Sequence, residues 1–359
     1  MAKLRDASCK MQIGVELAEI LAGTWRPLSF RKPKFLSEKL HRLAPLLTAG
    51  GGAALTWFGI RRHKSEFSEL VVNLYLEAYV ASAARAATHE AELERILLAF
   101  QATGVRSILL KGWSVGRLYP ESGLRPSGDI DLWIDPAQRA QAGEVLKRVA
   151  SGRQPVDLDH DQFRRFENRS FADFYASCET AHLGSTPIKV LQREDQTRTL
   201  CLHFLKHGGW RSIWLCDIAV LLESSNTTFS WDLCLGRNAR RARWIGCTIA
   251  LTRDLLGARI PPGAPRCVTS NPPGWFTRTI LREWSNPSAP NATSLALMIP
   301  ELKSRPWKLK STMLGRWRNP IQATVDCDRA FDVLPRWPYQ FWDGISRAHR
   351  FLSSSKQTA

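Results

Sequence analysis

Asp129 and Asp131 stand two residues apart in the segment DIDLWI, which ends at Ile134 and alternates as a β-strand does. Side chains two positions apart leave the same face of a strand, so the two carboxylates point the same way, while Ile130 and Leu132 point into apolar packing. Neighbouring carboxylates raise each other's pKa unless a cation lies between them, and Asp is a poor strand former. A divalent cation such as Mg²⁺ resolves both problems, so the pair predicts a metal site.

The short apolar segment 155–158 offers a third carboxylate. Asp157 lies between two apolar residues, so on a strand it faces away from both, as a partner of the aspartate pair would. Asp159 shares that face and is the alternative ligand. An aspartate-rich turn without a metal role is the other interpretation of this segment.

A lysine and a glycine precede the aspartates, between a strand predicted over residues 105–110 and a helix predicted over 113–118. Backbone N–H groups at a helix start, together with the ammonium of Lys111, suit a phosphate. Gly112 allows close approach of the backbone, and Ser114 can add a hydroxyl.

The loop before the aspartates holds three further candidates. Arg125 offers a guanidinium that can pair with a phosphate, and the alternative is that it braces its own loop. Ser127 and Gly128 directly precede the first aspartate and are expected to shape the loop there.

The order strand, glycine, helix and aspartate-bearing strand resembles the nucleotidyltransferase (polymerase-β-like) superfamily. More closely, the pattern LLKG, LYP and GLRPSGDIDLWI over residues 109–134 is similar to the bacterial family of uncharacterised nucleotidyltransferases. The similarity continues through LCLHFLKHGGWRSIWLCDIAVLL at 200–222 and WDL at 231–233, and covers about residues 70–261. In one departure from the superfamily pattern, Gly112 precedes Asp129 by 17 positions and a lysine replaces a small residue.

This resemblance implies an enzyme that transfers NMP from an NTP, with ATP expected, to an unidentified acceptor and releases pyrophosphate. The acceptor can be a small molecule, a peptide or natural-product intermediate, or a protein side chain. Mg²⁺ or Mn²⁺ is the implied cofactor, with two-metal charge stabilisation as the main catalytic effect. The implied metal ligands and catalytic carboxylates are Asp129, Asp131 and Asp157. The implied nucleotide-binding residues in this region are Lys111, Gly112, Ser114, Arg125 and Ser127.

Two histidines in the second similar segment are harder to interpret. His203 and His207 lie four residues apart on a helix predicted over 194–207, with Lys206 beside them. His203, Lys206 and His207 are candidates to contact the base or the triphosphate. The alternative for the two histidines is structural packing on the catalytic unit. Their spacing suits a metal, but no third ligand and no HExxH glutamate accompany them. Asp217 is expected to orient one of these histidines or an arginine.

The chain of 359 residues predicts an α+β fold, with a small mixed-sheet nucleotidyltransferase core between N-terminal helices and a C-terminal helical region. We expect helices over 1–92, the core over 93–193, a helical bundle over 194–262, and a basic, Trp- and Pro-rich helical tail over 263–359. A helix is expected over 231–240, and the uncharged run 43–60 is expected to form a buried helix–turn–helix.

The net charge of +17 suggests an anionic partner, but it is carried by the flanks. Residues before His63 contribute +7 (11 basic, 4 acidic), and residues from Arg259 onward contribute +9 (15 basic, 6 acidic). One alternative is therefore a nucleic-acid-binding protein, although nucleic acid is not favoured as a partner. Another is a non-catalytic regulator or antitoxin-like binding module on the same fold.

The location in the cell is predicted from two features. Eight cysteines without any CxxC spacing argue against a zinc ribbon and a tight disulfide framework, and they suit reduced thiols in the cytoplasm. The N-terminus lacks the apolar core of a signal peptide, and the run 43–60 is too short to cross a bilayer. We therefore expect a cytoplasmic protein without a membrane span.

Overall fold

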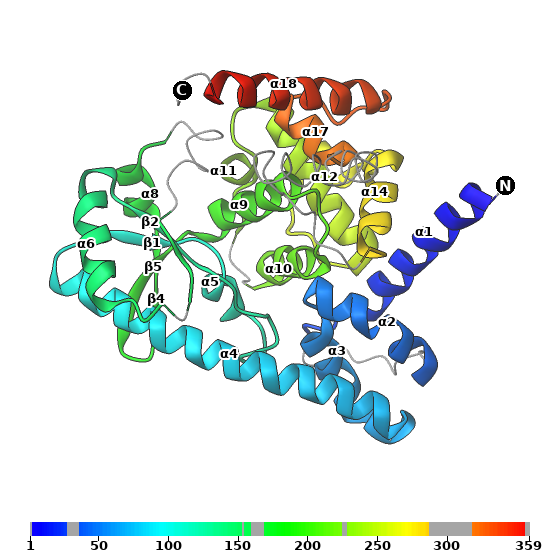
Figure 1. Cartoon of the computed structure of the whole chain (residues 1–359), viewed down its shortest axis with the longest axis horizontal. Helices are drawn as coiled ribbons and strands as arrows, with labels where there is room; N and C mark the ends of the chain where they lie inside the picture. The colour runs from blue at the N-terminus through cyan, green and yellow to red at the C-terminus, as the bar shows by residue number, and fades with distance from the viewer. Residues whose placement is uncertain are drawn as a thin grey trace.

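The chain folds into a five-stranded mixed sheet with helices around it, the α+β arrangement that the sequence predicts (Figure 1). The structure is a computed structural model, and it describes residues 2–26, 36–152, 154–158, 169–224, 228–286 and 318–355. Asp159, the alternative third carboxylate, lies outside these described residues.

The sheet has the strand order β3-β2-β1-β5-β4. The strands are β1 (Ser107–Leu109), β2 (Ile130–Ile134), β3 (Val156–Asp157), β4 (Glu179–Leu183) and β5 (Thr186–Val190). β2 is antiparallel to β1 and parallel to β3, while β5 is parallel to β1 and forms a hairpin with β4. The sequence analysis did not predict β4, because it is an edge strand whose outward residues Glu179, Thr180 and His182 are polar and exposed.

Different helices cover the two faces of the sheet. α4 (Glu69–Ala102) and α6 (Arg139–Val149) bury Ile130 and Leu132 in one core, together with Leu93 and Ile96 of α4. On the opposite face, Trp133 meets two aromatic rings of α8 (Phe171–Ser177) edge-on, with centroids 5.3 and 5.1 Å away. Because strand side chains alternate, Asp131 shares the face of Trp133 and not that of α4.

A second core joins the remaining helices to the N-terminal half of α4 (Figure 1). At the N-terminal end these helices are α1 (Ala2–Leu21), α2 (Ser37–Gly50) and α3 (Ala53–Ile60). After the sheet they are α9 (Arg193–Lys206), α10 (Ser212–Glu223), α11 (Trp231–Leu235), α12 (Ala239–Leu256), α13 (Arg266–Thr269), α14 (Gly274–Trp284) and α17 (Pro320–Asp326), and α18 (Trp337–Ser355) packs on α17. None of the helices among the described residues combines the length and the apolar character needed to cross a bilayer.

Two features of the helices bear on the sequence predictions. α2 and α3 are the buried helix–turn–helix expected over 43–60, and they are joined at Gly51, whose φ of 81° is in the left-handed region. The single helix expected over 231–240 is wrong, because α11 ends at Leu235. Gly236 follows with φ of 67°, and the side chain of Asn238 accepts a hydrogen bond from the Arg241 backbone and so starts α12 as a new helix.

Candidate active site

Three carboxylates gather where β2 and β3 run side by side. The parallel register pairs Ile130 with Val156 and Asp131 with Asp157, so the last two side chains leave the same face as neighbours. Asp129 directly precedes β2 and is exposed. Burial raises the pKa of Asp131, the nearby ammonium of Lys111 lowers it, and the charges of Asp157 and Asp129 raise it further. The three side chains therefore form one electrostatic cluster.

Lys111 supplies the positive charge in this cluster. Its Nζ lies 3.0 Å from Oδ1 of Asp131, and the two side chains are only 11% and 15% exposed. Within the part of the chain that the structure describes, no three His, Cys, Asp or Glu side chains already surround a metal position. The donor chemistry nevertheless suits Mg²⁺, because Asp131 and Asp157 are paired on adjacent strands and the ammonium of Lys111 occupies a cation position at Asp131.

The turn after Lys111 shapes one wall of the site. Gly112 has φ of 64° and ψ of −115°, which a residue with a side chain adopts only at a cost, and it starts the single turn of α5 (Trp113–Gly116). α5 is shorter than the helix predicted over 113–118. The hydroxyl of Ser114 is fully buried, donates to the Lys111 carbonyl at 3.3 Å and accepts from Gln196 at 2.6 Å. A phosphate contact from Ser114 would have to break the bond to the Lys111 carbonyl, because the hydroxyl has only one hydrogen to donate.

Arg125 braces the loop that precedes the aspartates. Its Nε lies 3.0 Å from both carboxylate oxygens of Asp217 on α10, and its Nη1 donates to the Pro126 carbonyl at 3.2 Å. Asp217 is completely buried and also accepts a hydrogen bond of 2.9 Å from the hydroxyl of Tyr119. Asp217 orients an arginine, as the sequence analysis allowed, and this contact ties the catalytic loop to the helical bundle.

His203 and His207 meet at the corner between α9 and α10. Their ring centroids are 4.5 Å apart, and both rings pack against Trp214, at 4.8 and 5.5 Å. Burial lowers the pKa of His207 to about 4, with further lowering by the charges of Lys206 and Lys111. Burial and Lys111 likewise lower the pKa of His203 well below its usual value. Both imidazoles are therefore neutral at pH 7, in surroundings that are rich in cations.

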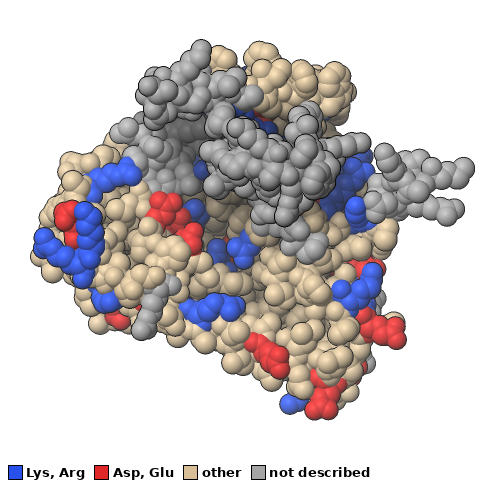
Figure 2. All heavy atoms as spheres, in the orientation of Figure 1, with Lys and Arg blue, Asp and Glu red and all other residues tan. Residues whose placement is uncertain are grey.

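Acidic and basic side chains lie close together around the hollow between the sheet and the helices (Figure 2). A family model described as uncharacterised nucleotidyltransferase matches residues 37–257, more than half of the chain. The chain belongs to this nucleotidyltransferase family. No curated protein and no solved structure matches it. The matched region of this nucleotidyltransferase begins with α2 and ends after α12, so it includes the whole sheet, the three carboxylates and the α9–α10 corner.

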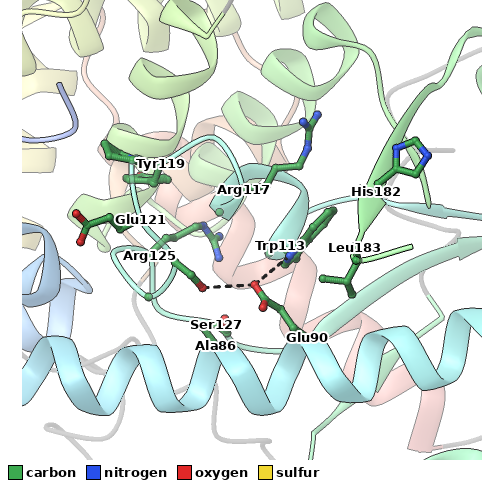
Figure 3. Close-up of a pocket in the computed structure, with 16 residues that line it drawn as sticks. Ala86, Glu90, Trp113, Arg117, Tyr119, Glu121, Arg125, Ser127, His182 and Leu183 are labelled. Carbon is green, nitrogen blue, oxygen red and sulfur yellow. Dashed lines mark hydrogen bonds between the residues drawn. The ribbon is translucent and has the colours of Figure 1, made fainter. Parts of the chain in front are cut away.

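A cavity of about 250 Å³ in the nucleotidyltransferase borders the site without including its carboxylates (Figure 3). Gly112, Arg125 and Ser127 line it, together with residues of α4, α5 and the β4–β5 hairpin. Glu90 of α4 projects into it and accepts hydrogen bonds from Trp113 at 3.2 Å and from Ser122 at 3.4 Å. Three of the predicted nucleotide-binding residues thus face this cavity, while Lys111 pairs with Asp131.

The sequence analysis of this nucleotidyltransferase missed several residues of the site. His89 of α4 is 1% exposed and lies against the backbone of Asp129, which raises its pKa, while burial lowers that pKa below its usual value. Tyr119 and Glu90 were missed too. The available signal was that His89 falls on the apolar, buried side of an otherwise amphipathic helix. A polar side chain is uncommon there unless it has a structural or functional role.

We expect the neutral state of His207 to make the nucleotidyltransferase sensitive to acid. The unfolded chain takes up a proton near pH 6.5, whereas the folded protein does so only near pH 4. Stability is therefore complete above pH 6.5 and falls as the pH drops towards 4, by on the order of 2–3 kcal/mol from this residue. In urea unfolding at pH 7 and pH 4.5, His207→Gln should lose less stability than the unmodified protein. Replacement of the exposed His182 by Gln is the control, and equal losses in all three proteins would contradict the prediction.

Proposed function

We propose that this protein transfers NMP from an NTP, with ATP the expected donor, to a hydroxyl-bearing acceptor and releases pyrophosphate. The observation that carries the proposal is the pairing of Asp131 with Asp157 across β2 and β3, with the charge of Asp129 also acting on Asp131. The largely buried carboxylate of Asp131 is costly unless a cation accompanies it. A divalent cation at this position, next to the glycine turn that follows β1, suits the phosphates of a nucleotide.

The three carboxylates have distinct roles in this proposal. Asp129, Asp131 and Asp157 would hold Mg²⁺ or Mn²⁺, and the bound ion supplies positive charge against the phosphates. Asp157, at the exposed edge strand, takes the proton from the acceptor hydroxyl. The acceptor oxygen forms a bond to the α-phosphorus, and the bond from that phosphorus to the bridging oxygen breaks. Pyrophosphate leaves with the electron pair of the broken bond.

The phosphate chain is proposed to lie between the carboxylates and the α9–α10 corner. The charge of Lys111 helps to lower the pKa values of both histidines of the corner, which supports this placement. Lys111 and Lys206 neutralise the phosphates, and His203 and His207 offer uncharged imidazoles that can donate hydrogen bonds. Gly112 and Ser127 border the nucleotide, and Arg125 holds their loop in place through Asp217.

The direct test uses each of the four NTPs, labelled at the α-phosphate, with Mg²⁺ or Mn²⁺. We expect pyrophosphate release and transfer of label to an acceptor in a cell extract, resolved into protein and small-molecule fractions, and no transfer in EDTA. Calorimetry with each metal–NTP complex, using a non-hydrolysable analogue, gives an independent measure of binding. If no complex binds and no pyrophosphate appears, the proposal is wrong and a non-catalytic binding module becomes the better interpretation.

A further inference from the structure

The ion pair between Lys111 and Asp131 occupies the place where the proposed function needs a divalent cation. Its Nζ–Oδ1 distance is 3.0 Å, and both side chains are largely buried. Asp131 is also the carboxylate that stands between the other two, because Asp157 lies beside it across the strands and Asp129 lies two residues before it. The ammonium thus holds the central carboxylate of the three.

The charges of the exposed Asp157 and Asp129 repel that of Asp131, and the burial of Asp131 makes this repulsion stronger than it is in water. The positive charge of Lys111 at Asp131 relieves part of this repulsion. A divalent ion that bound Asp131 would compete with the ammonium for the same carboxylate. Two cations held close together at one partly buried carboxylate repel each other, so binding of the divalent ion favours departure of the ammonium.

We propose that Lys111 is an internal counter-ion, which keeps the carboxylate cluster folded without metal and leaves Asp131 when a divalent cation binds there. This inference rests on the proposed function. The flexible four-carbon stem of Lys111 rotates about its own side-chain bonds, so the ammonium can turn away while the strands stay in place.

The surroundings of Lys111 determine what its displacement requires. On the helix side it faces the α9–α10 corner, where Lys206 carries a like charge and the two imidazoles are neutral. Moving the ammonium towards that corner is unfavourable unless an anion arrives there. The triphosphate of a nucleotide is such an anion, so the nucleotide draws Lys111 away and opens Asp131 to the metal. By linkage, metal and nucleotide then each strengthen the binding of the other by the same factor, typically about 5- to 150-fold.

The test measures metal binding without nucleotide, using Mn²⁺ as the probe and electron paramagnetic resonance to count the free ion. We expect Lys111→Met to bind Mn²⁺ at least about fivefold more tightly than the unmodified protein, because the competing charge is gone. In EDTA, the same variant should bind a fluorescent, non-hydrolysable ATP analogue more weakly. A higher affinity for Mn²⁺ together with a lower affinity for the ATP analogue is expected if Lys111 pairs with Asp131 in the free protein and with the phosphates in the complex.

Three controls separate the possible outcomes. Lys189→Met removes a half-buried lysine from the same sheet outside the cluster, and it should change neither affinity. Lys111→Gln serves as a second variant if Lys111→Met does not fold, and the rise in its unfolding temperature on adding Mn²⁺ should exceed that of the unmodified protein. Equal or weaker Mn²⁺ binding by the Lys111 variants would overturn the inference. If Mn²⁺ binding is instead insensitive to Asp129→Asn/Asp131→Asn, the metal site of the proposed function itself is wrong.

Discussion

Replacing Asp129 and Asp131 together by asparagine is expected to lower nucleotidyl transfer by on the order of 10³-fold or more while the protein stays folded. Asparagine keeps the size of the side chain but removes the two charges that would hold the cation. A bound metal contributes several kcal/mol of charge stabilisation in such reactions, and each 1.4 kcal/mol or so corresponds to a factor of ten in rate. The measurement is the rate of pyrophosphate release with Mg²⁺ and the NTP that the protein uses.

Asp135 offers a matched control for this prediction. It follows the same strand, caps the short helical turn at Pro136–Gln138 and forms an ion pair with Arg106, away from the three carboxylates. Asp135→Asn is therefore expected to cost some stability and to leave transfer nearly unchanged. Circular dichroism and thermal unfolding verify that the double variant is folded. Transfer that persists in the folded double variant would refute the assigned site.

Replacing Asp217 by alanine is expected to destabilise the fold by about 3–5 kcal/mol. Asp217 is completely buried, and its carboxylate accepts bonds from Arg125 and Tyr119. Removing it leaves the Arg125 guanidinium, only 11% exposed, without its anion, and leaves the buried hydroxyl of Tyr119 without its acceptor. An uncompensated buried charge costs far more than the net strength of the pair. Urea unfolding at pH 7 measures the change in free energy.

Two further variants show whether this cost comes from the network. Tyr119→Phe removes one neutral donor and should cost about 1–2 kcal/mol, since the carboxylate keeps Arg125. The double variant Arg125→Met/Asp217→Leu removes both charges, and it should be more stable than Asp217→Ala alone. A loss below about 1 kcal/mol in Asp217→Ala would mean that the ion pair does not anchor the loop. The predictions for Asp129/Asp131 and for Asp217 distinguish carboxylates proposed to act in catalysis from a carboxylate that holds Arg125 and its loop in place.

Much of the core around the site could be predicted because its signals are local. The alternation in 129–134 and the glycine after a strand each depend on residues a few positions apart, and β1 and β2 appear where expected. β4 could not be predicted, because an edge strand with an exposed polar face lacks a strong local pattern. The error at 231–240 came from counting apolar periodicity through Gly236 instead of treating it as a helix end.

The role of Arg125 shows the limit of sequence reasoning most clearly. Whether it meets a phosphate or braces its loop depends on Asp217, 92 positions away on another helix. The same holds for His89, which approaches Asp129 only because α4 packs across the sheet. Such contacts produce no periodic pattern in the sequence, because they form only when whole helices and strands pack together.

By itself, then, the sequence determined the chemical types at the site: two aspartates on one strand face, a lysine–glycine turn ahead of them, and a pair of histidines one helical turn apart. Those features follow from the short-range geometry of strands and helices. Only the tertiary structure decided which charged side chains lie close enough to interact. The β2–β3 register placed Asp157 beside Asp131, the end of β1 brought Lys111 to the same carboxylate, and α10 provided the anion for Arg125. Charges interact through space, so their pairing is set by how the elements pack and not by their order along the chain.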